Sequence, residues 1–233
     1  MIAGRSLSLG SVALLAALSA SFGAWSAESG PAVADVQLSD AAQNLAAATS
    51  LVEVADETEG VIGTAAQAQI HEVVDYQAPD RQSVTLTIRA TTPVRDTYSV
   101  RTLIQIGPSC WTHATGTQES PLPCSRQAQQ QFFDALQKLE SSSGVTEVGG
   151  TYFLSPKDSR TEIQGLSPGE LSVGMASVEV HISGETISSI RLSFNAGVKG
   201  STILVDDAIT FMDIDQGPAV VEPAGPPTAT APR

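Results

Sequence analysis

The stretch VVDYQAPDRQSVTLTI, residues 73–88, combines an apolar extended run, a sharp corner and a run of alternating side chains. Pro79 lacks an amide hydrogen and has a fixed φ angle, so a strand that reaches it cannot continue through it. Asp80 favours a turn at the same place. Beyond the turn, apolar residues alternate with polar ones over positions 84–90, which is typical of a strand with one buried face. The stretch therefore predicts two strands joined at a corner.

Alternation of this kind returns along the chain in runs, with few helical segments between them. Further strands are predicted over residues 63–74, 98–106, 145–154, 178–182, 190–194 and 203–211. The spacing of apolar residues predicts one helix over residues 39–52 and a second after Ser125, in RQAQQQFFDALQKLE. Polar or Pro- and Gly-containing segments at residues 56–60, 109–124 and 156–170 are expected to be turns or loops. Strands in runs indicate the α+β class, with an antiparallel sheet covered on one face by helices.

The amino-terminal residues have the pattern of a secretory signal peptide. Arg5 precedes an apolar run at residues 12–18, and small residues follow at residues 24–27. We therefore expect residues 1–27 to be a signal peptide, with cleavage and export to the periplasm, the cell envelope or the medium. An uncleaved membrane anchor is the alternative, but the apolar run is shorter than the roughly 20 residues of a spanning helix. No cysteine stands near the cleavage region, so no lipid anchor is expected there.

The rest of the chain divides into three parts. Residues 28–38 are interpreted as a linker, and residues 39–215 as one folded domain of ordinary size. Residues 216–233 include GPAVVEPAGPPTATAPR, which is rich in proline and is expected to be a disordered tail.

Charge and composition argue against two kinds of partner. The chain has 12 basic and 25 acidic residues, and its net charge is -13. Nucleic acid and anionic membrane surfaces both attract basic patches, so binding to either is not expected. Hydrophobic residues make up 42% of the chain but aromatic residues only 5%, which predicts a largely aliphatic core.

The chain has two cysteines, Cys110 and Cys124. In an exported protein a disulfide between them is expected, with two free thiols or a redox pair as the alternatives. Two cysteines alone cannot form a four-ligand zinc site.

Few residues have the pattern of a catalytic or metal site. His71, His113 and His181 have no His or Cys partner at the spacing of metal ligands, so no metal is expected. Asp206, Asp207 and the DID segment at residues 213–215 could bind a cation or act as general acid and base. Acid pairs in so acidic a chain are, however, usually solvated. Nucleophile-elbow, Walker and dinucleotide-binding motifs are absent from the sequence, so we expect no catalytic residues, no cofactor and no enzyme.

Several short segments, taken in chain order, resemble one family. YQAPDR, IQIGPSCW and GTYFLSP are followed by VEVHISGETISSIRLSF and AITFMDID. In this order they resemble the LolA-like lipoprotein-carrier superfamily and, within it, the LppX/LprG-type lipid-binding proteins, over residues 39–215. The resemblance implies a strongly curved antiparallel sheet, a half-barrel, whose concave face is covered by helices. It also implies that acyl chains occupy the apolar space between sheet and helices. Those proteins are typically lipid-anchored and do not generally have the cysteine pair, and this chain differs on both points.

The expected function is that of an exported carrier or binding protein that holds the acyl chains of a lipid or lipoprotein. The alternative is a non-enzymatic envelope sensor or protein-binding module on the same fold, whose partner is another envelope protein. The residues expected to line the apolar cavity are Val84, Leu86, Ile88, Val100, Ile104 and Ile106 on strands, with Phe132, Leu136 and Leu139 on the second helix. Ordinary core packing is the alternative role for each of them.

Overall fold

The computed structural model describes residues 31–116, 122, 144–166, 172–198 and 200–230. Two helices lie in this part of the chain, α1 (Pro31–Ala46) and α3 (Pro156–Leu166). The strands are β1 (Ser50–Val61), β2 (Gln67–Gln77), β3 (Arg81–Thr92), β4 (Arg95–Ile106), β5 (Ser109–Gly116), β6 (Thr146–Val148), β7 (Thr151–Phe153), β8 (Ser172–Ser183), β9 (Thr186–Val198), β10 (Ser201–Met212) and β11 (Ala229–Thr230).

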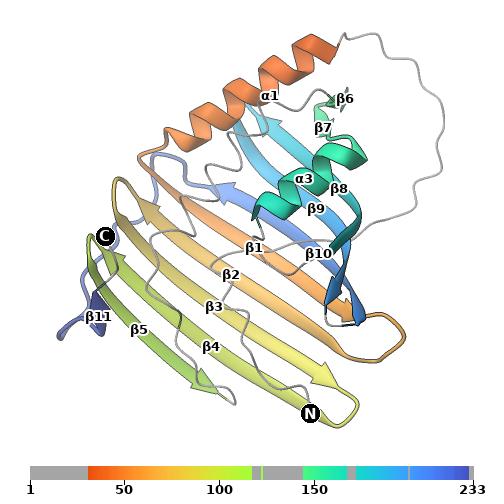
Figure 1. Ribbon diagram of the computed structural model, residues 1–233. Coiled ribbons are helices and arrows are strands. Elements are labelled where there is room, and N and C mark those ends of the chain that lie inside the picture. The colour runs from red at the N-terminus through yellow and green to blue at the C-terminus, as the bar shows by residue number, and fades with distance from the viewer. Residues whose placement is uncertain (1–30, 117–121, 123–143, 167–171, 199, 231–233) are drawn as a thin grey trace.

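The described strands form one curved, open sheet (Figure 1). Its order is β11-β5-β4-β3-β2-β1-β10-β9-β8-β7-β6, and every neighbouring pair is antiparallel. Most neighbours are consecutive along the chain, whereas β1 pairs with the distant β10 and joins two runs of strands. The prediction of an antiparallel sheet in an α+β protein is confirmed.

The corner in the opening stretch lies where the sequence places it. β2 ends at Gln77 and β3 begins at Arg81, with Pro79 between them after a cis peptide bond. Backbone hydrogen bonds join the corner to its neighbours, from the Gly107 amide to the Asp80 carbonyl at 3.0 Å and from the Ala78 amide to the preceding helix–strand connection at 2.8 Å. The corner thus holds β2 and β3 in the middle of the sheet.

Alternation along each strand divides the side chains between two faces. We call inner the face that carries Leu51, Val84 and Leu192, and outer the opposite face. Directly paired residues share a face. Leu103 on β4, which opposes Val84, and Asp207 on β10, which opposes Leu192, therefore also lie on the inner face. The inner face holds most of the buried residues.

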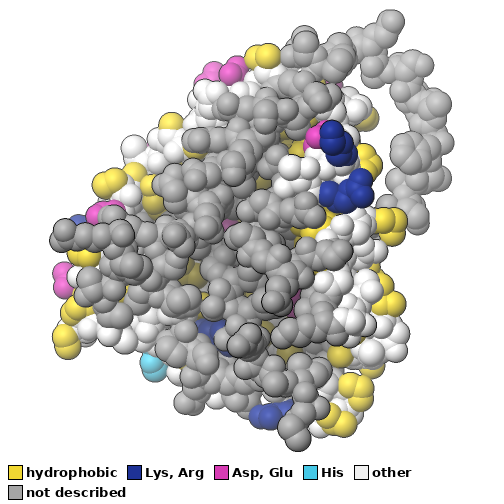
Figure 2. Space-filling view, in the orientation of Figure 1, with side chains coloured by type: hydrophobic (Ala, Val, Ile, Leu, Met, Phe, Trp, Pro, Cys, Tyr) yellow, Lys and Arg dark blue, Asp and Glu magenta, His cyan; other side chains and the backbone are white. Residues whose placement is uncertain are grey.

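Both described helices pack over one half of the inner face (Figure 1). α1 lies on β9 and α3 on β8, and the fully buried Leu38, Leu45 and Ile163 join the cluster that they form with β8, β9 and β10. α3 turns its polar side outward, and Figure 2 shows basic side chains over this helix, which contains Lys157 and Arg160. This helix-covered half is the main core.

A second apolar cluster lies on the other half of the inner face. It consists of Val74, Val84, Leu86, Leu103, Cys110 and Leu122, with Ile70 and Ile88 packed against it. It spans strands β2 to β5, away from β8 and β9, on which α1 and α3 pack. We call it the β2–β5 cluster.

Several segments differ from the sequence prediction. Residues 31–38, interpreted as part of a linker, form the first half of α1. Residues 50–61 were predicted to be the end of a helix and a polar turn. They form β1, because this segment pairs with β10 on one side and β2 on the other. Residues 109–116, read as loop, form β5 against β4. Residues 156–166, also read as loop, form α3, whose first turn is capped by the Ser155 hydroxyl accepting from the Asp158 amide at 3.2 Å.

The segment after residue 215, predicted to be a disordered tail, is placed along the sheet in the structure. Val220 is buried, and its carbonyl accepts a hydrogen bond from the Arg81 guanidinium at 3.2 Å. Further on, the Trp111 indole N–H donates to the Gly225 carbonyl at 3.1 Å, and β11 pairs with β5. Proline stiffens an extended segment and so lowers the entropy lost when it docks on an edge strand. The signal peptide expected at residues 1–27 lies outside the described residues.

Candidate functional site: the inner face of the sheet

The strand residues predicted to line a cavity do not share one face. Val84, Leu86 and Ile88 lie on the inner face in the β2–β5 cluster. Since Val84 opposes Leu103, the neighbouring Ile104 lies on the outer face. Val100 and Ile106 lie there too, and all three are half-buried. Leu103 is the β4 residue that the prediction missed.

Alternation misled the prediction in β4 because its buried face is mostly polar. Ser99, Arg101, Leu103 and Gln105 point inward, and all four are buried. The Gln105 carboxamide oxygen accepts a hydrogen bond from the Gln82 amide on β3 at 2.9 Å. In the sequence, a buried polar face has the same pattern as a solvent-exposed face. The predicted helix residues Phe132, Leu136 and Leu139 lie outside the described residues.

Four buried acids form a group in the middle of the inner face. Their exposed fractions are 6% for Glu53, 6% for Glu57, 9% for Glu72 and 0% for Asp207. Glu57 on β1 directly opposes Asp207 on β10, and Glu72 on β2 opposes Ala55, between Glu53 and Glu57. Directly opposed side chains have Cβ atoms about 5 Å apart, and diagonal ones about 7 Å. We call these four residues the acidic band.

Burial and repulsion from neighbouring acids raise the pKa values of three acids of the band, Glu53, Glu57 and Asp207. Removal from water, and then the charge of Glu72, raises the pKa of Glu53 to about 8. The same causes, with Glu53 and Glu72 as the charges, raise the pKa of Asp207 to about 8. Burial, followed by repulsion from Glu59 and Asp207, raises the pKa of Glu57 well above its ordinary value. The formal net charge of the chain, -13, counts every acid as ionised. It therefore overstates the negative charge that these buried acids carry.

Among the residues that the structure describes, two buried polar groups on this face have no hydrogen-bond partner. Neither carboxyl oxygen of Asp207 is paired, and the Arg101 Nε is also unpaired. A buried polar group without a partner costs about 1–3 kcal/mol, and more if it is charged. Native proteins have few such groups, and a group of this kind calls for a functional or structural explanation. Local sequence did not predict this burial, because Asp206-Asp207 resembled a solvated acid pair.

The other acids predicted as site candidates have structural roles. Asp206 lies on the outer face, with its carboxylate 3.6 Å from the Arg191 guanidinium. Asp215 accepts hydrogen bonds from the Thr49 amide and hydroxyl, both at 2.7 Å. These bonds lower the pKa of Asp215 and join the end of β10 to the start of β1. Asp213, like Asp215, has a positive φ angle in the turn.

The histidines lie apart from one another. His71 Nδ1 lies 2.7 Å from Asp56 Oδ1 on the outer face, His181 Nδ1 lies 3.2 Å from the Thr151 hydroxyl, and His113 is exposed on β5. Within the described ranges, no three His, Cys, Asp or Glu side chains are arranged to hold a metal ion. Cys110 is fully buried and no described cysteine is a free thiol, but Cys124 lies outside the described residues, so the pairing of the two stays a prediction.

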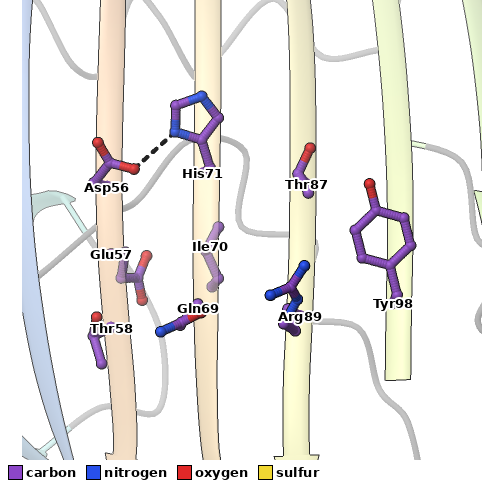
Figure 3. Close-up of a pocket in the computed structure, with 9 residues that line it drawn as sticks. All are labelled: Asp56, Glu57, Thr58, Gln69, Ile70, His71, Thr87, Arg89 and Tyr98. Atoms are coloured by element: carbon purple, nitrogen blue, oxygen red, sulfur yellow. Dashed lines mark hydrogen bonds and ion pairs between the residues drawn. The ribbon is translucent and has the colours of Figure 1, made fainter. Parts of the chain in front are cut away.

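The outer face has a polar hollow across β1 to β4 (Figure 3). Its volume is about 280 Å³. Figure 3 shows two rows of side chains, one with Asp56, His71 and Thr87 and another with Thr58, Gln69, Arg89 and Tyr98. The first row contains the ion pair between His71 and Asp56, and Tyr98 is half-exposed at the far side. The side chains that line this hollow can offer hydrogen bonds to a partner.

The fold is thus a large open antiparallel sheet with a partly apolar, partly acidic inner face. No helix in the described part of the chain is long and apolar enough to cross a membrane. No protein-family model matches the sequence, and no curated protein matches it.

Solved structures provide two comparisons. The crystal structure of LprF from Mycobacterium bovis aligns with 83% of this chain and 98% of its own, at 12% identity and a TM-score of 0.38. Lipoprotein LppX from Mycobacterium tuberculosis aligns with 82% of this chain and 99% of its own, at 12% identity and a TM-score of 0.41. LppX is also one of the proteins that the sequence resembles.

Proposed function

We propose that this protein is an exported, non-enzymatic carrier or binding protein that holds acyl chains of a lipid or lipoprotein against the inner face of its sheet. The observation that carries this proposal is the β2–β5 cluster, a group of buried apolar residues separate from the core that α1 and α3 cover. Apolar burial has no directional requirement, so such residues can hold acyl chains without any catalytic group.

The β2–β5 cluster has a suitable size for a stretch of acyl chain. From Val84 to Ile88 it extends four residues along β3, which is about 13 Å at the rise of a strand. An acyl segment that buried six methylene groups there would gain about 5 kcal/mol, before the entropy lost on binding. We propose that the predicted helix with Phe132, Leu136 and Leu139 completes the cover of the concave face.

The test is native mass spectrometry of the protein purified from an exporting host, before and after organic extraction. The proposal expects an added mass that matches a lipid and disappears on extraction. Two adjacent residues of β4 provide matched variants, since Leu103 faces inward and Ile104 outward. Leu103→Gln should reduce lipid uptake, and Ile104→Gln should leave it unchanged. A clean protein mass, with no uptake when lipid is added back, would reject the carrier function.

The polar hollow favours a second candidate function, a protein-binding module that uses the outer face. A double variant, Arg89→Ala with Tyr98→Ala, should then remove capture of a defined envelope partner without changing lipid uptake. Unchanged capture by this variant would reject that function.

A further inference from the structure

We infer that the amphiphile bound on the inner face carries a positively charged amino group, and that this group binds at the acidic band. The inference rests on the proposed function and adds the chemical class of the ligand. It concerns Glu53, Glu57, Glu72 and Asp207, which lie between the two apolar halves of the inner face.

The position of the band fits the polar group of an amphiphile. On the β10 side, Asp207 is flanked along its strand by the buried Val205 and Ile209 of the main core. On the β2 side, Glu72 is flanked by Ile70 and Val74 of the β2–β5 cluster. An acyl chain that lies against the β2–β5 cluster would therefore bring its polar end next to carboxyl groups.

Asp207 provides the independent observation that a partner is missing. It is fully buried on β10, and neither of its carboxyl oxygens has a hydrogen-bond partner in the described part of the chain. The register turns its side chain toward the inner face, directly opposite Glu57. A primary ammonium has three N–H donors and no acceptor, so one group could serve both oxygens of Asp207 and a neighbouring carboxylate.

The charge of the ligand follows from what the acids lack. Burial and repulsion from neighbouring acids raise the pKa values of Glu53 and Asp207, and a cation beside them would favour their charged forms by direct attraction. A neutral hydroxyl would donate a hydrogen bond but would leave the repulsion in place. A carboxylate or phosphate would add to the repulsion and would have to pair with Arg101, which opposes Leu86 two strands away from the band.

The experiment compares three probes that share one alkyl chain, dodecylammonium, dodecanol and dodecanoate, by calorimetric titration below their micelle concentrations. At pH 7 dodecylammonium should bind at least 10-fold more tightly than dodecanoate, with dodecanol between them. Binding of dodecylammonium should also release about one proton, seen as a dependence of the heat on the ionisation enthalpy of the buffer. The groups that face this site are Glu53, Glu57, Glu59, Glu72, Asp207 and Arg101.

Adjacent residues again provide the control. Asp207→Asn should weaken dodecylammonium about 10-fold or more and leave dodecanol unchanged. Asp206→Asn, on the outer face beside Arg191, should change neither. Glu57→Gln serves as a second variant if Asp207→Asn does not fold.

The outcomes separate this inference from the proposed function. If dodecanoate binds as tightly as dodecylammonium, or more tightly with a loss in Arg101→Gln, the amino group is wrong while the acyl-chain carrier stands. If dodecanol and dodecanoate bind but no proton is released with the amine, the inference is also overturned. If none of the three probes binds, the carrier function fails and the inference fails with it.

Discussion

Raising the pH from 5 to 8 should weaken the folded state of this protein, because the acidic band must ionise in a buried site. The pKa of Asp207 is 3.8 as a free side chain and about 8 in the folded protein. Between these values the folded protein holds a proton that the unfolded chain has lost. The free energy of unfolding therefore falls as the pH rises, and this loss is complete only above about pH 8.

The magnitude follows from the size of the pKa shift. One such group lowers the free energy of unfolding by about 1.4 kcal/mol for each pH unit. Over the three units from pH 5 to pH 8 this amounts to about 4 kcal/mol. Glu53 titrates in the same window, but it is coupled to the other acids of the band, so we count one group only.

Urea unfolding at pH 5, 6, 7 and 8 measures the effect. Asp207→Asn should reduce the slope of the free energy of unfolding against pH by about 1.4 kcal/mol per unit. The stability of the variant relative to the wild type should therefore increase as the pH rises. Asp206→Asn is the control, because Asp206 is partly exposed on the outer face, and its slope should match that of the wild type. Equal slopes for the wild type and Asp207→Asn would refute the protonated, buried state of Asp207.

Three further predictions concern the fold. Leu45→Ala should lower the free energy of unfolding by about 2–5 kcal/mol in urea titrations, because Leu45 is fully buried under α1, whereas the exposed Val36→Ala should have little effect. Gly116→Ala should lower the melting temperature seen by circular dichroism, because the added Cβ would clash with backbone atoms of β4 at a φ angle of 112°. Truncation after residue 216 should shift the fluorescence of Trp111 to longer wavelength, because it removes the carbonyl to which the indole donates; an unchanged spectrum would contradict the docked tail.

The sequence predicted the central strands well where one parity is apolar and the other polar. β3 and β10 have this pattern, and the Pro79 corner between β2 and β3 lies where a residue without an amide hydrogen must end a strand. β8 and β9 contain the strands predicted over residues 178–182 and 190–194, and they join in a hairpin at Gly184. These are features that neighbouring residues fix among themselves.

The acidic band could not be predicted, because its burial depends on pairing between distant strands. Glu53 and Glu57 look like a polar turn until β10 and β2 enclose β1. Asp207 looks like half of a solvated acid pair until alternation turns it inward and Asp206 outward. Local composition gives the opposite of the true environment in both places, since a buried carboxyl conflicts with every local preference. Sites at which local reasoning fails in this way are often functional.

Ionisation of the acidic band affects both the stability of the free protein and its affinity for the proposed ligand. An ammonium group stays charged up to about pH 10, so the free carboxylates of the band favour it more as the pH rises from 6 to 8. Binding of dodecylammonium should therefore tighten over the same range in which the unliganded protein loses stability. At a ligand concentration of 100 times the dissociation constant, binding would restore about 2.7 kcal/mol. If the band were only a packing defect, the affinity for dodecylammonium and the free energy of unfolding would fall together as the pH rises. A binding site is distinguished from such a defect by an affinity that rises while the stability of the unliganded protein falls.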